Sequence, residues 1–403
     1  MTAILAGAAL AVTPTVAADR LPAGLTVDRA VLLMRHGVRP PTNAQPLPAA
    51  VTPETWPDWP TKPGWLTPHG AVAVGRVGSW DGARFRGLGL LPHTGCPAAG
   101  TIRVIADSDQ RTIATADAWI AALAPGCHVA SEHRPQDERD PIFSPIDESA
   151  PFDPARADAA VGAAIGRGGI AAVETPYRPL LARLDAVLCG SHKAGCGVRQ
   201  EASGLISAKP GKRPKLTGAL DRASTAAQIL LLEYADGKPT PKVGWGRARA
   251  GDIAAFSAFH ALEFRLLARP PYVAAANMGG IVPLIREGLT GSVRVTMLSG
   301  HDTNVASLGG LLDLHWTVPG LAMDDPAPGG AIVLERLRDR RGGLYVRALY
   351  RSQTLEQIRA AGPLANNPPY LAALPIPGCV ALGVKGLCTL AAFEKKLDGP
   401  PSD

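Results

Sequence analysis

The sequence predicts an α/β protein that carries a helical insertion, and two kinds of segment support this prediction. Three short apolar runs are typical of buried strands: residues 31–34, 102–105 and 293–298. The middle of the chain, residues 154–265, is instead rich in Ala and Leu with helical periodicity. Because strands precede and follow this stretch, we expect helices inserted into an α/β domain.

Further elements follow from local patterns. Apolar residues at helical spacing predict a helix over 112–123, and Asp107, Ser108 and Asp109 before it are candidate N-caps. A second helix is expected to begin near residue 305. Residues 331–337 and 345–350 read as a late β-hairpin that turns through 341–343.

A length of 403 residues is more than one simple core requires, so we expect a large and a smaller unit. We assign residues 19–145 and 267–403 to a discontinuous α/β catalytic domain and residues 146–266 to an α-helical cap domain. Residues 1–18 are interpreted as a signal peptide.

The signal peptide is predicted from an apolar run at 3–12 and from small residues before Asp19, although a basic start is missing. The run is too short to cross a bilayer. No other stretch is long and apolar enough to do so. We therefore expect a periplasmic or secreted protein with no membrane attachment after cleavage; the alternative is an apolar tail.

Six cysteines follow the predicted leader, and an even number in an exported protein suggests three disulfides. Six cysteines allow many connectivities. Closeness in sequence favours three pairs: Cys96–Cys127, Cys189–Cys196 and Cys379–Cys388. The alternative is that these residues are buried free thiols.

The formal net charge of +6 and the pI of about 9.1 favour anionic partners. Basic residues are scattered, except for a run at 209–215 that lies among prolines and a glycine and is typical of a solvated loop. Aromatic residues make up only 5% of the chain and do not interleave with that run. We therefore expect no nucleic-acid partner.

Polar clusters follow each of the three predicted strands. They contain Arg35, His36 and Arg39, then Arg111, then His301 and Asp302. Ligands of open α/β sheets bind beyond the carboxyl ends of strands, so these clusters are expected to converge. Three guanidinium groups with two imidazoles and one carboxylate suit a phosphate monoester, since arginine pairs with phosphate oxygens in bidentate geometry.

The same residues suggest a chemistry. A neutral His36 imidazole is a candidate nucleophile toward phosphorus, and Asp302 is a candidate proton donor to the leaving alkoxide. The arginines supply the neutralising charge that a metal ion often supplies in phosphoryl transfer. The other histidines show no metal-ligand spacing, so we predict no metal and no cofactor.

At these residues the chain resembles the histidine acid phosphatases. The segment Arg35-His36-Gly37-Val38-Arg39-Pro40-Pro41 and the pair His301-Asp302 are similar to the signatures of that family, most of all in its bacterial periplasmic phytase and glucose-1-phosphatase branch. The resemblance implies His36 as nucleophile, Asp302 as proton donor, and Arg35, Arg39, Arg111 and His301 as phosphate ligands. It also implies a phosphoglycerate-mutase-like three-layer α/β domain with a smaller helical domain, and the three short-range disulfides agree with the family pattern.

Four further residues are candidates for a substrate rim: Thr42, Asn43, Gln228 and Thr303. Two departures from the family pattern bear on substrate and stability. Gln228 stands where the phytase branch carries an acidic residue, and Ile146 stands where one family disulfide would begin. The expected substrate is a small phosphate monoester, such as phytate or a sugar phosphate, and the expected assembly a monomer or weak dimer.

Two other functions share these features. Cofactor-dependent phosphoglycerate mutases open with the same Arg-His-Gly tripeptide, but predicted export and disulfides disfavour a cytosolic mutase. A protein that only binds phosphate esters requires the arginines but not a proton donor, so the presence of both His36 and Asp302 favours an enzyme.

Overall fold

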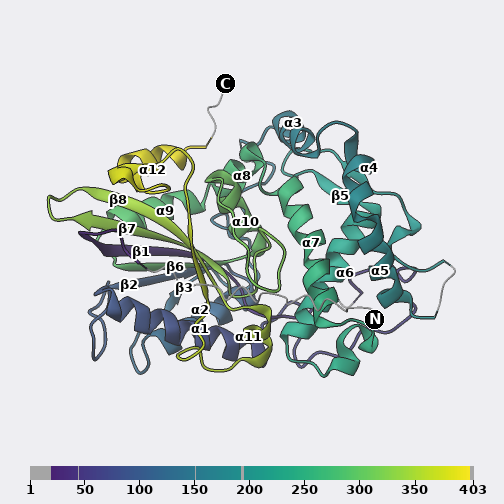
Figure 1. Cartoon of the computed structure of the whole chain (residues 1–403), viewed down its shortest axis with the longest axis horizontal. Coiled ribbons are helices and arrows are strands. Elements are labelled where there is room, and N and C mark those ends of the chain that lie inside the picture. Colours follow the sequence, from purple (N-terminus) through teal and green to yellow (C-terminus); the bar gives the residue numbers. More distant parts are fainter. Residues whose placement is uncertain (1–19, 44, 150, 192–194, 400–403) are drawn as a thin grey trace, which may run out of the picture.

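A mixed β-sheet forms the core of one part of the molecule in the computed structural model, which describes residues 20–399 apart from 44, 150 and 192–194 (Figure 1). The predicted leader, 1–18, lies outside the described residues. Within the described residues the strand order is β10-β8-β7-β1-β6-β2-β3, and β9 also pairs with β8. The strands are β1 Leu25–Arg35, β2 Ile102–Ala106, β3 Ser131–Glu132, β6 Val295–Gly300, β7 Ala331–Asp339, β8 Leu344–Ser352, β9 Tyr370–Leu374 and β10 Cys388–Thr389.

Helices cover both faces of this sheet because its central strands are apolar on both sides. On β1, Leu32 and Met34 pack with the core under helices α1 (Pro68–Gly87) and α2 (Gln110–Leu123). Val31 and Leu33, one residue out of phase, pack with the core under α9 (Ile281–Thr290) and α10 (Asp302–Leu311). This three-layer α/β arrangement confirms the predicted fold class (Figure 1).

The helical stretch lies beside the sheet and between β3 and β6 in the chain (Figure 1). The structure also contains elements that the sequence did not predict, a two-stranded antiparallel sheet of β4 and β5. The elements of this part are α3 Pro154–Ile165, α4 Gly169–Glu174, η1 Thr175–Tyr177, α5 Arg178–Cys189, η2 Val198–Gln200, β4 Gly204–Ile206, β5 Lys215–Thr217, α6 Gly218–Ala235, η3 Thr240–Gly246 and α7 Ala250–Leu267.

Four further elements complete the fold: α8 Pro271–Met278, α11 Leu355–Ala360, η4 Ala381–Gly383 and α12 Leu390–Lys396. All three expected strands, the 112–123 helix and the late hairpin are confirmed; β1 begins six residues earlier than expected, at Leu25, and the other boundaries differ by at most two residues. The helix expected near residue 305 begins earlier, at Asp302, because His301 ends the preceding extended segment and takes the N-cap position. This shift places Asp302 in the first helical turn.

The two helices under the site pack unusually closely. A Cβ atom added to Gly78 of α1 would lie 2.4 Å from the carbonyl oxygen of Trp119 in α2, so only glycine fits there. The indole of Trp119 is fully buried and donates a hydrogen bond to Asp81 at 2.8 Å. This contact fixes α2, which carries Arg111 in its first turn.

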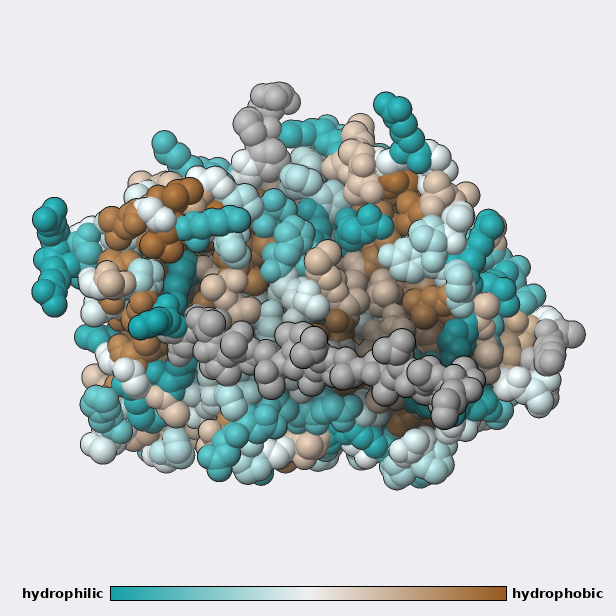
Figure 2. Space-filling view, viewed as in Figure 1, coloured by the Kyte–Doolittle hydropathy of each residue, from teal (hydrophilic) through white to brown (hydrophobic). Residues whose placement is uncertain are grey.

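None of the helices in the described part of the chain combines the length and apolar character that crossing a membrane requires. The face shown in Figure 2 carries hydrophilic side chains over both the sheet-bearing part and the helical part.

All three predicted disulfides are present: Cys96–Cys127, Cys189–Cys196 and Cys379–Cys388. No free cysteine remains among the described residues, which rules out the free-thiol alternative.

We expect the Cys96–Cys127 bridge to stabilise the fold most, because it closes a 31-residue separation whereas Cys189–Cys196 closes seven. Each bridge should contribute about 2–4 kcal/mol to the free energy of unfolding by restricting the unfolded chain, and more for the longer loop. Urea unfolding of C96A/C127A, with C189A/C196A as the matched variant, measures both. Equal stability of the two variants and the parent would contradict this expectation.

Candidate active site

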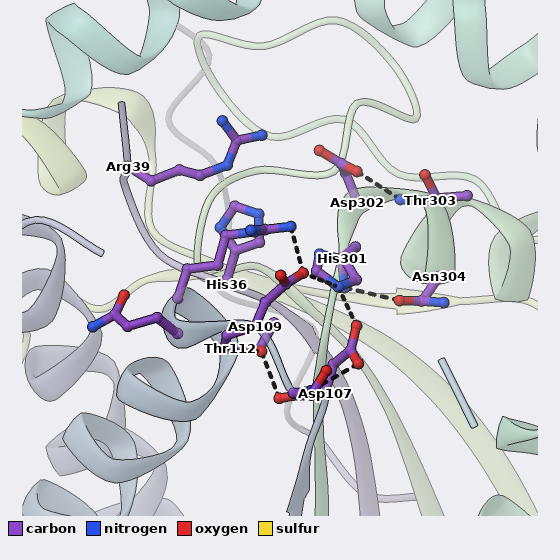
Figure 3. Close-up of polar contacts among 12 residues, drawn as sticks. His36, Arg39, Asp107, Asp109, Thr112, His301, Asp302, Thr303 and Asn304 are labelled. Carbon is purple, nitrogen blue, oxygen red and sulfur yellow. Dashed lines mark hydrogen bonds and ion pairs between the residues drawn. The ribbon is translucent and has the colours of Figure 1, made fainter. Parts of the chain in front are cut away.

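The parallel pairing of β2, β6 and β1 brings three separated segments to one edge of the sheet. Arg35 pairs in register with Gly300, and Ala106 with Ser299. The residues that directly follow these strands are His36, Asp107 and His301, and they therefore lie side by side at the same edge of the sheet. Figure 3 shows these side chains converging with Arg39, Asp109 and Asp302. The predicted convergence of the strand ends is confirmed.

His36 is held as a neutral imidazole with one nitrogen free. Its side chain is buried, and Nδ1 lies 2.8 Å from the carbonyl oxygen of Gly37, to which a protonated Nδ1 donates. Nε2 then carries the lone pair. Burial, together with the charges of Arg39, Arg111, Arg35 and His301, lowers the pKa of His36 well below 6.5.

Gly37 allows this placement because the chain is tightly packed behind the histidine. An added Cβ would lie 2.8 Å from methyl groups of both Leu66 and Val74. The Gly37 amide also donates a hydrogen bond to Thr115 of α2 at 3.0 Å. A larger residue at this position would displace His36 from the sheet edge.

Three arginines present unpaired donors next to His36. The Nε atoms of Arg35, Arg39 and Arg111 are buried and have no hydrogen-bond partner among the described residues. Burial first, and then the charge of Arg111, lowers the pKa of Arg39 to about 10. Buried donors without acceptors are costly, so this set of donors favours a bound anion that would accept from them.

His301 is oriented by two carboxylates. Its Nε2 lies 2.5 Å from Asp107 Oδ2 and 3.4 Å from Asp109 Oδ2 (Figure 3). The backbone amide of His301 donates to Asn304 Oδ1 at 2.9 Å, which anchors the start of α10. The ring of His301 stands 5.6 Å from that of His36, at an angle of 72° between planes.

Asp107 and Asp109 thus act differently from their expected capping role. Asp109 occupies the N-cap position of α2, but its carboxylate makes no capping hydrogen bond. It forms an ion pair of 2.6 Å with Arg111 instead. Neither aspartate was predicted from sequence as a site residue.

Asp302 is held as an ionised carboxylate by the cations around it. Its Oδ1 accepts from the Thr303 amide at 2.8 Å, and its Oδ2 lies 3.0 Å from Arg35 Nη2. Burial raises its pKa, but the charges of Arg35, His260, His36 and Arg39 outweigh this and lower the pKa far below the usual 3.8.

A pocket of about 280 Å³, here called the central pocket, opens above Asp302. Three of the four predicted rim residues line it, namely Thr42, Asn43 and Gln228. Gln228 also accepts a hydrogen bond from Arg35 at 2.9 Å, which helps to fix the position of the Arg35 guanidinium. The fourth rim residue, Thr303, lines two neighbouring pockets instead.

Two further titratable residues, His260 and Glu263, line the central pocket and were not identified from sequence. His260 Nδ1 lies 2.6 Å from Asp325 and its Nε2 3.8 Å from Asp302. Glu263, which lines the pocket, accepts from Ser224 at 2.5 Å, and burial raises its pKa. Both His260 and Glu263 lie on α7, which is far from the strand-end motifs in the sequence although close to them in space.

Asp107, Asp109 and His301 offer ligand atoms within 4.8 Å of one another, the one such group found in the described part of the chain. Their atoms are already paired, Asp109 with Arg111 and Asp107 with His301 Nε2. A cation here would compete with Arg111 for the same carboxylate, so the donor set does not fit a resident metal well.

The site thus combines a buried neutral imidazole with guanidinium donors that have no partner among the described residues, a set that suits an anionic ligand. The sequence model of the family described as "Histidine phosphatase superfamily (branch 2)" matches this chain over residues 26–158 and 284–351. The chain is 36% identical over 400 residues to phytase AppA of Escherichia coli, covering 92% of this chain and 91% of the relative. It is 27% identical to a glucose-1-phosphatase of Providencia rettgeri, covering 95% and 94%.

The fold agrees with these similarities. A Hafnia alvei phytase solved in complex with myo-inositol hexakis sulphate superposes with a TM-score of 0.85 at 34% identity, covering 94% of this chain and 97% of that one. The chain therefore belongs to branch 2 of the histidine phosphatase superfamily. It is a phosphoric monoester hydrolase of the acid phosphatase class.

Proposed function

We propose that this protein is an exported histidine acid phosphatase that hydrolyses phosphate monoesters through a phosphohistidine on His36, with Asp302 as proton donor. The observation that carries the proposal is the position of three unpaired, buried guanidinium Nε donors around a neutral His36 whose Nε2 is free. Arg35, Arg39, Arg111 and His301 would bind the phosphate oxygens.

In the first step, His36 Nε2 would form a bond to phosphorus while the bond from phosphorus to the ester oxygen breaks. The leaving oxygen would take the proton of Asp302 and depart as an alcohol. In the second step, the ionised Asp302 would remove a proton from water, whose oxygen attacks phosphorus and releases His36 and inorganic phosphate. Arginine charge would stabilise the developing negative charge in both steps.

The proton on Asp302 would come from the substrate. The charges of Arg35, His260, His36 and Arg39 favour the ionised form of Asp302, whereas a phosphate monoester has a second pKa of about 6 and would arrive as a monoanion in acid. Binding would place the phosphate charge beside Arg35, which weakens the pairing of Arg35 with Asp302 and raises the carboxyl pKa. The proton would then pass from phosphate to Asp302.

The names of the relatives support two substrate classes, phytate and sugar phosphates. Export is supported by three disulfides in the described chain, because such bonds persist in oxidising compartments. We also propose the domain division at residues 146 and 267, which is supported by the run of helices α3–α7 between β3 and β6.

Hydrolysis of p-nitrophenyl phosphate, glucose 1-phosphate and phytate in the presence of EDTA tests the proposal. We expect turnover of at least one ester, unchanged by the chelator, because the arginines supply the charge neutralisation. Absence of turnover with all three would contradict the function. Loss of turnover with EDTA, restored by magnesium or zinc, would contradict the metal-free mechanism.

We expect that kcat/KM does not decrease when the pH is lowered through 6.5. The lowered pKa of His36 keeps the free nucleophile neutral well into the acid range. Above about pH 6, kcat/KM should fall as the monoanionic substrate that carries the proton disappears. Steady-state rates from pH 3 to 9 measure this; an acid limb centred near 6.5 would show that His36 titrates normally.

A further inference from the structure

A second pocket, here called the side pocket, adjoins the phosphate-binding residues. It has a volume of about 280 Å³ and shares His301 with the candidate active site. Its lining comes from the segment after β3, from the β4–β5 connection, and from α8 and α10. The residues that line it are Phe143, Ser144, Pro145, Ile146, Gly211, Arg213, Asn277, His301, Thr303 and Asn304.

The side pocket favours an anion. Its lining includes the guanidinium of Arg213 and the imidazole of His301, and no Asp or Glu. The central pocket, by contrast, contains the carboxylates of Asp302 and Glu263. A hollow with one sign of charge attracts ligands of the opposite sign, so the two pockets should receive different parts of a substrate.

The guanidinium of Arg213 makes no hydrogen bond or ion pair with any other residue that the structure describes. Most arginines near the site are paired, as Arg35 is with Asp302 and Arg111 with Asp109. The Arg213 residue is exposed to solvent as a whole. Desolvation by the surrounding protein nevertheless lowers the pKa of its guanidinium, although the negative charges of Glu263 and Asp302 act to raise it. A free guanidinium fork in a concave site is suited to a phosphate group.

The loop that carries Arg213 is fixed in place. Lys209 and Lys212 exchange backbone hydrogen bonds of 2.9 and 3.0 Å across a tight turn. Gly211, at a φ of +69°, packs against residues 147–148, where an added Cβ would lie 2.5 Å from the Glu148 nitrogen. Lys212, Lys215 and Arg213 line the adjoining pocket of about 390 Å³, against one carboxylate, Glu263. The fold therefore holds a group of cations at this edge of the site.

We propose that Arg213 binds a second, non-scissile phosphate in the side pocket while the first phosphate lies at His36. The preferred substrates are then small molecules that carry phosphates on neighbouring positions, and esters with a single phosphate leave Arg213 unused. This inference rests on the proposed function, because it assigns the second site relative to the scissile phosphate.

Binding of two probes to the full chain tests the inference without turnover. Isothermal titration calorimetry with myo-inositol hexakissulfate and with inorganic phosphate gives a dissociation constant for each. Arg213→Gln should weaken hexasulfate binding at least about tenfold more than phosphate binding, the range for a lost charge-assisted contact. Arg213→Lys, which keeps the charge but not the fork, should fall between. Lys209→Gln removes a charge from the same loop outside the side pocket and should change neither constant.

The outcomes are distinct. A selective loss of hexasulfate binding in Arg213→Gln supports the inference, whereas equal losses for both probes, or none, overturn it. Phosphate binding also reports whether each variant retains a folded site. If the parent chain binds both probes but hydrolyses no phosphate ester, the proposed function fails. The role of Arg213 is then decided only by how much more Arg213→Gln weakens hexasulfate binding than phosphate binding.

Discussion

His36→Ala is expected to reduce kcat for p-nitrophenyl phosphate by about 10⁴-fold or more, the scale seen when an enzyme loses its nucleophile. His36 contributes a reactive nitrogen and little apolar volume, and the one hydrogen bond of its side chain to the described residues runs to the adjacent Gly37 carbonyl. The variant should therefore fold. Its arginines should still bind phosphate, because none of them is hydrogen-bonded to His36.

Rapid quenching without acid, followed by peptide mapping, should detect a phosphohistidine on the His36 peptide of the parent enzyme. The exposed His93→Ala variant serves as control and should retain both activity and label. Substantial turnover by a folded His36→Ala variant, or label on a different residue, would remove the nucleophilic role from His36.

The layers of the fold were predictable because each strand or helix is indicated by the spacing of apolar residues within its own segment. The apolar run at β1 is short and unbroken, as in a strand buried on both faces, and the structure places helices over both faces. The β4–β5 hairpin was not predictable in this way. Its strands have three residues each, and Lys209, Gly211 and Lys212 between them are typical of an ordinary loop.

The candidate site was predictable where it lies at strand ends and was missed elsewhere. Asp107 and Asp109 precede a helix, where aspartate is a common cap, and nothing in the linear sequence indicates that they face His301, 194 residues from Asp107. His260 and Asp325 were missed for the same reason. Their contact spans 65 residues and depends on how α7 packs against the loop before β7.

Asp302→Asn is expected to separate substrates by their leaving groups. An alkoxide from a sugar or inositol requires a proton in the transition state, whereas p-nitrophenolate is stable enough to leave with little help. General-acid assistance is typically worth about 10²–10⁴-fold, so phosphoenzyme formation from alkyl phosphates should fall by that factor, with a small loss for p-nitrophenyl phosphate. Asparagine keeps the size of the side chain and the oxygen that accepts from Thr303, which limits structural change.

The substitution also removes the charge that pairs with Arg35 at 3.0 Å, but this affects both substrates alike. The decisive quantity is therefore the ratio of first-step rates, measured by stopped-flow burst kinetics, because the second step slows with any substrate once water is no longer activated. Asp107→Asn is the matched control: it removes a carboxylate that orients His301 and should slow both substrates by the same factor. If Asp302→Asn also slows both equally, Asp302 only positions its neighbours, and Glu263 or the His260–Asp325 pair becomes the candidate proton donor at the central pocket.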